Sequence, residues 1–257
     1  MNIKNLVLLG LAPFVVIAGE HPVIETFEGQ QSALRVMRDG QEVQLQEGDD
    51  LLPGDQMVTQ DESVTIAYPD QTSVTLSENS TLKISASDDM SDKNLQIEKG
   101  SIHSKVTSDA QTKRPYRMVI KGSYATIGVR GTEFTVEADS ENNEINVHTL
   151  EGVVEAAQTE DDLKQNRVTT VPALESLRAR RAQAFEKRQF RRDEFLKRFQ
   201  QRHPKFMRQI EKPRRPFMQL RQKQLQRRQT IRQNQPHHKP PHRPGALQKI
   251  RQNHKNR

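Results

Sequence analysis

Short segments in which apolar and polar residues alternate run from Ala33 to Ala157, and they restrict the fold of this chain more than any other feature. The segments are centred about ten residues apart, and turn signals at Pro69-Asp70, Glu78-Asn79 and Glu98 to Gly100 lie between them. We therefore predict an all-β domain, built as a sandwich or as a roll of stacked strands. The apolar pairs expected to face its core are Val64 and Ile66, Val74 and Leu76, Leu82 and Ile84, Leu95 and Ile97, Met118 and Ile120, and Ile145 and Val147.

The decapeptide ATIGVRGTEF, residues 125–134, changes the phase of this alternation. Before the glycines the inward-facing residues, Ile127 and Val129, are odd-numbered, and after them they are even-numbered, beginning with Phe134. Because a strand has a side-chain period of two, one extra residue must lie in between. Gly131 is the natural place, since glycine accepts the positive φ or the close backbone approach of a bulge or tight corner. A phosphate-binding loop would need Gly-Lys-Ser/Thr at the start of a helix, so we interpret the motif as a structural corner.

Arg130 stands inside this corner, where burial of its charge would be costly without a partner. Its guanidinium could donate hydrogen bonds to main-chain carbonyl oxygens or to a carboxylate such as that of Glu133. We expect this structural role, with contact to a ligand as the alternative. The corner residues are Gly128, Arg130, Gly131, Thr132 and Glu133.

Four segments together resemble the FecR domain, a periplasmic module first known from iron-siderophore signalling regulators of Gram-negative bacteria. They are Leu45 to Ile84, with its glycine-aspartate turns, LQIEKGSIHSKV at Leu95 to Val106, ATIGVRGTEFTV at Ala125 to Val136, and HTLEGVVEA at His148 to Ala156. The resemblance covers about residues 45–157. It implies a roll or solenoid-like stack of short strands, a hairpin at Glu-Lys-Gly-Ser, and a binding or signalling role without an established enzymatic activity.

The N-terminal residues MNIKNLVLLGLAPFVVIAGEHP have the features of a secretory signal peptide. Lys4 precedes an apolar stretch of 13 residues, which is shorter than the roughly 20 residues of a spanning helix. Val16 and Ala18 stand three and one residues before the expected cut, as at a signal-peptidase site, so cleavage is expected near Ala18 or Gly19. We expect a signal peptide over residues 1–18, lead-in strands over residues 19–44, and a soluble periplasmic protein. A buried N-terminal strand or helix and an uncleaved anchor are the alternatives. Because little chain precedes the β-domain, we expect a stand-alone exported FecR-domain protein without a sigma-binding segment or a transmembrane helix in the mature chain.

Charge divides the chain into an acidic and a basic part. Residues 1–170 contain 14 Lys and Arg against 28 Asp and Glu, a formal charge of −14, whereas residues 171–257 contain 26 against 5, a charge of +21. The net charge of +7 is therefore a poor guide to partners. We assign residues 158–172 to a linker and residues 173–257 to a basic tail that is partly helical and partly disordered.

High helix propensity in the tail covers residues 173–203 and 217–233, with prolines between them, and the chain reads as disordered from Asn234 onward. The tail could lie against the acidic domain, adhere to lipopolysaccharide, anionic lipid or peptidoglycan, or bind nucleic acid, which export disfavours. We expect adhesion, because arginine gives bidentate contacts to phosphate. The arginines expected to make it are Arg178, Arg180, Arg181, Arg188, Arg191, Arg192, Arg214, Arg215, Arg227 and Arg228.

No residue pattern indicates catalysis, a cofactor or a metal site. The chain has no cysteine, its aspartates fall in turn contexts, and it contains no nucleophile elbow or EF-hand pattern. His237, His238 and His242 could chelate a metal weakly, but solvated histidines are the simpler interpretation, and His103 and His148 lie in expected strands. We predict a non-enzymatic protein that binds an envelope protein or glycan and is tethered by its tail. The alternative is a periplasmic component of an iron- or stress-responsive signalling system that acts through a separate membrane regulator.

Overall fold

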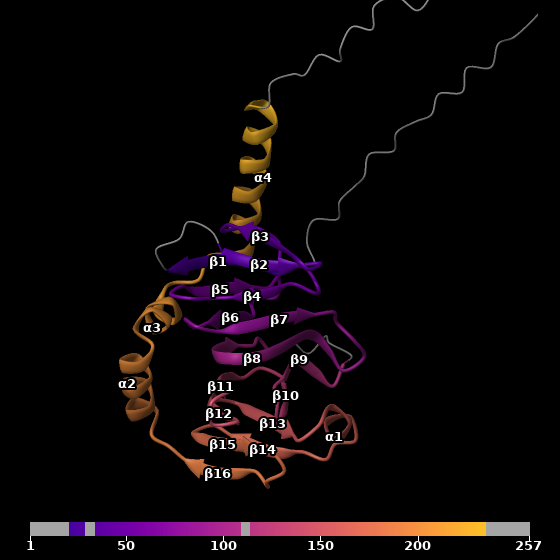
Figure 1. The fold of residues 1–257 in the computed structure, drawn as a ribbon, viewed down its shortest axis with the longest axis vertical. Helices are drawn as coiled ribbons and strands as arrows, with labels where there is room; N and C mark the ends of the chain where they lie inside the picture. Colours follow the sequence, from indigo (N-terminus) through magenta and orange to yellow (C-terminus); the bar gives the residue numbers. More distant parts are fainter. Residues whose placement is uncertain (1–20, 29–33, 109–113, 235–257) are drawn as a thin grey trace, which may run out of the picture.

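A computed structural model describes residues 21–28, 34–108 and 114–234 of the chain. These residues form a tall stack of short strands, with two helices along one side and a last helix that projects from one end (Figure 1). From here on, the tail means residues 190–234, which follow the last strand and contain these three helices. The expected signal peptide and the histidines at 237, 238 and 242 lie outside the described residues. Within the described ranges, no helix combines the length and the apolar character that crossing a membrane requires.

Two sheets face each other in the stack. We call the first the tail-covered sheet, and in spatial order it contains β1 (Val23–Glu28), β5 (Ser63–Ala67), β6 (Ser73–Leu76), the second half of β8 (Ser91–Lys105), β11 (Glu133–Asp139), β12 (Glu144–Glu151), β15 (Glu175–Arg180) and β16 (Glu186–Gln189). The opposite sheet contains β3 (Gln41–Leu45), β2 (Leu34–Arg38), β4 (Gln56–Val58), β7 (Thr81–Ser85), the first half of β8, β9 (Tyr116–Lys121), β10 (Thr126–Val129), β13 (Val153–Ala157) and β14 (Thr169–Pro172).

The long strand β8 joins the two sheets. Its first half pairs with β7 and, in parallel, with β9, whereas its second half pairs antiparallel with β6 and β11. Gly100 lies where the strand changes sheet, with a φ of 91°, and a Cβ at this position would collide with Ser80. The turn signal from Glu98 to Gly100, expected to be a hairpin, is therefore a bend inside one strand, because glycine allows the positive φ without ending the pairing.

One apolar core fills the space between the two sheets. All six residue pairs expected to face it are buried, and none of these side chains is more than 4% exposed. Phe134 is 0% exposed, and burial of a side chain of this size contributes roughly 1.5–3 kcal/mol. The all-β prediction is confirmed. The strands stack as in a roll and the sheets face each other as in a sandwich, without closing into a barrel.

The first part of the basic segment forms strands, and the helix predicted from residue 173 was wrong there. β14, β15 and β16 continue the two sheets, and the first long helix begins only at Arg192. Leu177 and Ala179 are 0% exposed and extend the core beside β12. Arginine has a high intrinsic helix propensity, but burial of alternate side chains in a sheet outweighs it here.

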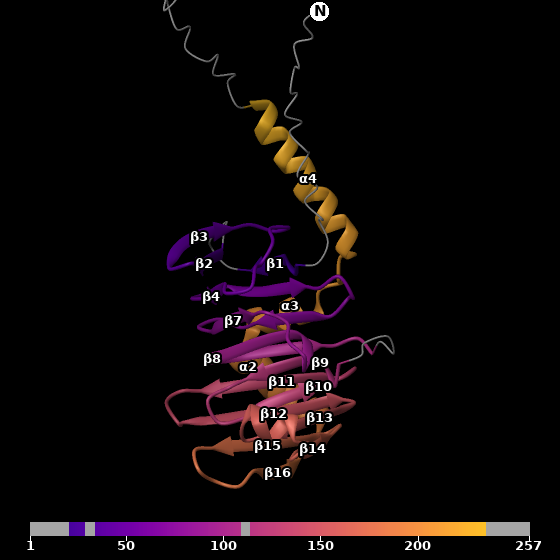
Figure 2. The ribbon, with the colours of Figure 1, turned by 90° about the vertical axis from the view of Figure 1, so that its right-hand side faces the viewer.

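Prolines separate the three helices that follow. Helix α2 (Arg192–Arg202) ends before Pro204, which begins α3 (Pro204–Glu211), and Pro216 precedes α4 (Phe217–Asn234). Figure 2 shows α2 and α3 behind the strands, against the outer face of the tail-covered sheet, while α4 points away from the stack. The short helix α1 (Glu160–Lys164) packs Leu163 against Tyr116 on the opposite sheet.

Candidate functional site

The ATIGVRGTEF corner is the point at which the chain crosses from one sheet to the other. β10 ends at Val129 in the opposite sheet, and β11 begins at Glu133 in the tail-covered sheet. Gly131 has a φ of 86°, and a Cβ there would collide with the neighbouring loop. Gly128 lies against the ring of Tyr116, where an added Cβ would come within 2.6 Å of the ring carbons. The extra residue that the change of phase demanded thus belongs to a tight corner between sheets.

Two side chains of the corner hold main-chain groups of neighbouring segments. Arg130 is exposed, and its guanidinium donates to the carbonyl oxygen of Pro115 and, at 2.8 Å, to that of Arg114. Thr132 is buried, and its hydroxyl donates to the carbonyl oxygen of Val153 at 2.9 Å. The corner therefore connects the loop before β9 with the start of β13.

The sequence offers Glu133 as a possible partner for Arg130, but in the structure this carboxylate points toward the tail. Its oxygens lie 3.4 Å from Nε2 of His103 and 3.8 Å from Nη2 of Arg192, the first residue of α2. The hydrogen bond with His103 lowers the pKa of Glu133 against the opposing effect of burial. Glu133, the last of the five corner residues, thus lies at the contact between domain and tail.

An aromatic cluster fixes the tail on the outer face of the tail-covered sheet. The rings of Phe190, Phe195, Phe199 and Phe206 contact one another in series, with centroids 5.2 to 5.3 Å apart. The imidazole of His148, which projects outward from β12, lies 4.4 Å from the ring of Phe195. Phe199 and Phe206 are 1% and 0% exposed. Because His148 and Leu150 of β12 pack against these rings, and an aromatic pair contributes about 0.5–1.5 kcal/mol beyond its burial, the tail is packed on the domain and not merely attracted to it by charge.

Acidic side chains of the domain meet basic side chains of the tail around the aromatic cluster. Glu137 of β11 accepts a hydrogen bond from Arg202 at 2.9 Å and lies 3.3 Å from His148. Burial would raise the pKa of Glu137, but the hydrogen bond with His148 and the charge of Arg202 outweigh it, and the pKa is lowered. Glu28 of β1 pairs with Arg208 of α3 at 2.6 Å. The interface is therefore charged as well as aromatic.

The acidic turn between β3 and β4 receives the start of α4. Arg221 and Arg228 both pair with Asp50 of this turn. Gly48 lies beneath the helix with a φ of 86°, and a Cβ there would come within 3.3 Å of the carbonyl oxygen of Leu220. The shape of the turn, as well as its charge, matches the helix.

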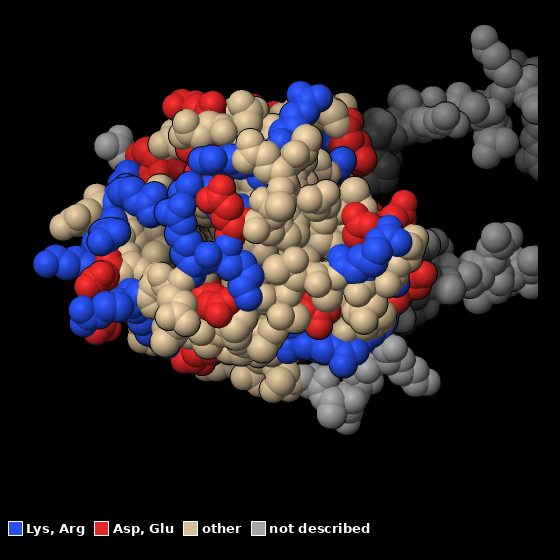
Figure 3. Space-filling model, turned by 90° about the horizontal axis from the view of Figure 1, so that it is seen from below, with Lys and Arg blue, Asp and Glu red and all other residues tan. Residues whose placement is uncertain are grey.

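The ten arginines expected to contact an anionic surface do not form one patch. Four lie near α4, at one end of the stack, and six lie near β15, β16 and the start of α2, at the other. Figure 3 looks at this second end and shows basic side chains gathered on part of it, with acidic side chains among them. The ion pairs are Arg214 with Glu25, Arg215 with Glu47, Arg227 with Asp49, Arg228 with Asp50, Arg178 and Arg180 with Glu144, Arg188 with Glu186, Arg191 with Glu194 and Arg192 with Glu151, while Arg181 is exposed.

The arrangement is suited to recognition. Carboxylates, imidazoles and threonine hydroxyls on the outer face of the tail-covered sheet lie beside an apolar cluster, which is the usual composition of a protein contact surface. In the part of the chain that the structure describes, no three His, Asp or Glu side chains are placed to hold a metal ion.

The residues that make this interface carry only a weak signal in the sequence. The alternation places His103 and His148 in strands but gives them no partner. Phe195 and Phe199 are four residues apart, which puts them on one face of a helix, yet no pattern shows what that face contacts. The surface beneath them is polar, so the usual search for a complementary apolar face misses it.

The region that contains the corner is matched by the family model described as FecR protein, over residues 55–155. A search of curated proteins finds no match. Two crystal structures from Parabacteroides distasonis, described as candidate anti-sigma factors, are similar in structure. One is 19% identical with a TM-score of 0.41 and the other 18% identical with a TM-score of 0.45; the matches cover 51% and 56% of this chain but only 57% and 63% of those chains. The family match includes the whole corner and, on the acidic side of the interface, Glu133 and Glu137 but not Glu28. Residues 55–155 are therefore similar to a FecR domain.

Proposed function

We propose that this chain is a non-enzymatic binding module of a cell-envelope signalling system, and that its tail is an internal ligand of the FecR domain. The observation that carries the proposal is the aromatic cluster with its flanking ion pairs. Side chains of β11 and β12 are contacted by α2, and β5 and β6 are contacted by α3; these four strands lie inside the matched region, and both helices lie outside it. A face that a segment of the same chain occupies is also open to a segment of another protein with the same chemistry.

The charge of the face defines that chemistry. Glu28, Glu133 and Glu137 line it, so a competing segment must carry arginine or lysine beside aromatic residues, as α2 and α3 do. Such a segment can bind only those copies of this protein whose own tail is detached. Its apparent affinity is therefore lower than its intrinsic affinity by the fraction of copies with a detached tail. Binding releases the basic tail, which changes the surface that a membrane regulator would meet. The expected signal peptide would place this exchange in the periplasm.

The experiment compares cells that lack the protein with cells that produce the wild type, a tail-release variant or a control variant. The tail-release variant combines Phe199→Ala with Phe206→Ala. The control is Arg198→Ala, because this side chain on α2 is 78% exposed and pairs with Glu194 of its own helix. Genome-wide transcript levels are measured in iron-replete, iron-limited and envelope-stress conditions.

The tail-release variant should change a set of transcripts without the inducing condition, and the control variant should match the wild type. If all four strains have the same transcript profile in every condition, the signalling function is rejected. If the control variant behaves like the tail-release variant, the response does not come from tail detachment.

Tethering to anionic envelope material is the second candidate, and the arginines near β16 favour it, since Arg181 and Arg188 are exposed there. The arginines near α4 give it less support, because they would have to leave acidic partners of their own domain. Co-sedimentation with wall sacculi and lipopolysaccharide vesicles across a salt series tests the idea. A tether loses binding steeply as salt rises and is weakened by Arg181→Gln with Arg188→Gln, whereas absent or salt-independent binding excludes it.

A further inference from the structure

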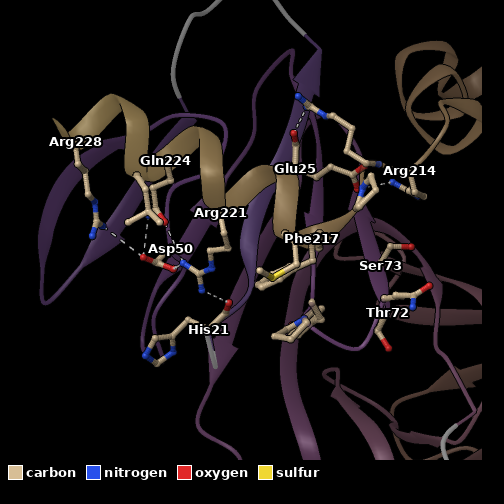
Figure 4. A pocket seen from close by; sticks show the side chains of 18 residues that line it. His21, Glu25, Asp50, Thr72, Ser73, Arg214, Phe217, Arg221, Gln224 and Arg228 are labelled. Atoms are coloured by element: carbon tan, nitrogen blue, oxygen red, sulfur yellow. Dashed lines mark hydrogen bonds and ion pairs between the residues drawn. The ribbon is translucent and has the colours of Figure 1, made fainter. Parts of the chain in front are cut away.

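A cavity of about 680 Å³ lies between the first strands of the stack and the tail, at the start of α4 (Figure 4). Its walls come from His21 and β1, from Asp50 in the turn between β3 and β4, from the turn between β5 and β6, and from residues 214–228 of the tail. Neither part of the chain encloses the space alone. The volume falls within the roughly 300–1,000 Å³ of sites that bind small molecules.

One side of the cavity is apolar. Ala67 and Tyr68 contribute to it from the domain, and Phe217, Met218 and Leu225 contribute from α4. Met218 and Leu225 are 67% and 49% exposed, which makes them two of the few large hydrophobic side chains open to water in the described ranges. Covering them with the apolar body of a ligand would be favourable, because it removes this surface from water.

The other side carries more positive than negative charge. Four arginines line the cavity, but only two carboxylates do, those of Glu25 and Asp50. Asp50 is shared between Arg221 and Arg228, so this group keeps one positive charge in excess. Helix α4 begins at the cavity without an acidic residue in its first turn, and its N-terminal dipole adds positive potential.

Arg221 gives the most specific indication of a ligand. Its side chain is only 9% exposed, and its terminal nitrogens donate to Asp50 and, at 2.9 Å, to the carbonyl oxygen of His21. Figure 4 shows these three residues together at one end of the space. The Nε of Arg221 is buried and has no hydrogen-bond acceptor. An unpaired buried donor is costly, and a ligand oxygen that reaches it at this end of the cavity would satisfy it.

We propose that this cavity binds a free fatty acid in its ionised form, with its hydrocarbon chain against Met218 and Leu225 and its carboxylate on Arg221 and Arg228. The combination of an apolar wall and excess positive charge at one end selects an amphipathic anion over a neutral or cationic molecule. Because the walls belong to both the domain and the tail, the bound ligand stabilises the docked tail. This site goes beyond the proposed signalling function and does not depend on it.

Isothermal titration calorimetry of the full mature protein with dodecanoate, below its critical micelle concentration, tests the proposal. Dodecyltrimethylammonium has the same chain with a cationic head, and acetate is the head group alone. We expect saturable binding of dodecanoate, at least about tenfold weaker binding of the cationic amphiphile, and none of acetate. Equal binding of both amphiphiles, or no saturable binding of dodecanoate, would overturn the proposal.

Variants locate the binding. Leu225→Glu places a carboxylate on an exposed part of the wall, and Arg221→Met removes the unpaired donor; each should weaken dodecanoate binding by about tenfold or more. The matched control is Arg227→Met, which removes an arginine of the same helix that pairs with Asp49 and does not line the cavity. Circular dichroism checks that each variant keeps the fold. Because Leu225 is exposed, Leu225→Glu should fold normally. Unchanged binding by both cavity variants, or equal weakening by the control, would overturn the assignment to this cavity.

Discussion

The interior between the two sheets and the interface between the tail-covered sheet and the tail bury their side chains in different ways. The interior is mainly apolar, and Phe134 lies at 0% exposure within it. The interface combines the aromatic cluster with ion pairs such as Glu137 with Arg202. Apolar burial is insensitive to screening, whereas partly exposed ion pairs are weak and are screened by salt. The interior therefore decides whether the chain folds, and the interface can open while the interior stays closed.

The largest effect should come from the interior. Phe134→Ala leaves a cavity in the core and should lower the free energy of unfolding by roughly 3–5 kcal/mol. Urea unfolding followed by circular dichroism measures it, and the sheet and the tail should unfold together at lower urea. A loss below about 1 kcal/mol would mean that the site collapses easily and that the interior is no more tightly packed than the interface.

A smaller and local effect is expected at the interface. Phe199→Ala should detach α2 and α3, at a cost below the roughly 3–5 kcal/mol of a core phenylalanine because the tail can leave without unfolding the sheets. Hydrogen exchange should show lost protection over residues 192–211 and unchanged protection in β8 and β11. Arg198→Ala, exposed on the same helix, should leave both regions as in the wild type. Loss of protection throughout the sheets would show that domain and tail form one cooperative unit.

This difference also explains which parts of the fold the sequence could predict. Strands such as β5 and β7 could be predicted, because one face of each contributes to the interior and the alternation of Val64 and Ile66, or Leu82 and Ile84, records it. The crossing at Gly131 could be predicted from the change of phase. β15 could not, since its outward residues are arginines that favour a helix and only Leu177 and Ala179 mark the buried face.

The tail interface could not be predicted either. Its domain side consists of residues such as Thr135, Glu137 and His148, residue types that are equally common on solvent-exposed strand faces. Its tail side, with Phe195 and Phe199, showed only that some helical face is apolar. The opposite charges of the two parts indicate that they attract each other. Net charge does not specify which residues pair, so it cannot predict which face of the domain the tail covers.

Acidification should open the interface and leave the interior intact. The pKa values of Glu28 and Glu137 are lowered from 4.5: burial raises each, and this is outweighed by hydrogen bonds and charges, from Arg208 and Lys212 at Glu28 and from His148 and Arg202 at Glu137. A carboxyl group whose pKa is depressed by folding contributes stability that is present above its unfolded pKa and is lost as the pH falls through its folded pKa. Tail docking should thus weaken as the pH falls below about 4.5, where these carboxylates gain protons. His203, which packs on Phe199 and Phe206, adds a loss that begins below 6.5, because burial lowers its pKa and disfavours its charged form in the docked tail.

Energy transfer between dyes measures this opening, and the absence of cysteine allows specific labelling at Lys99→Cys and Arg198→Cys, both at exposed positions. Transfer should change below the ordinary carboxyl pKa while the circular dichroism of the strands persists. Glu137→Gln in the labelled protein should make docking weaker at neutral pH and less dependent on pH. Transfer that stays constant in acid would mean that the aromatic cluster alone holds the tail.

The smallest effect is expected at the corner that joins the two sheets. Arg130 is exposed, so Arg130→Ala removes two hydrogen bonds to main-chain carbonyl oxygens whose place water can take, and the expected loss is about 1 kcal/mol. Arg130→Lys is the matched control, because lysine keeps the charge but lacks the planar fork that reaches both carbonyls, and it should lose nearly as much. Thermal unfolding measures both. Full stability in both variants would remove the structural role and leave contact with a ligand as the reason for an arginine here, whereas a loss as large as that of Phe134→Ala would place the corner with the interior in the comparison.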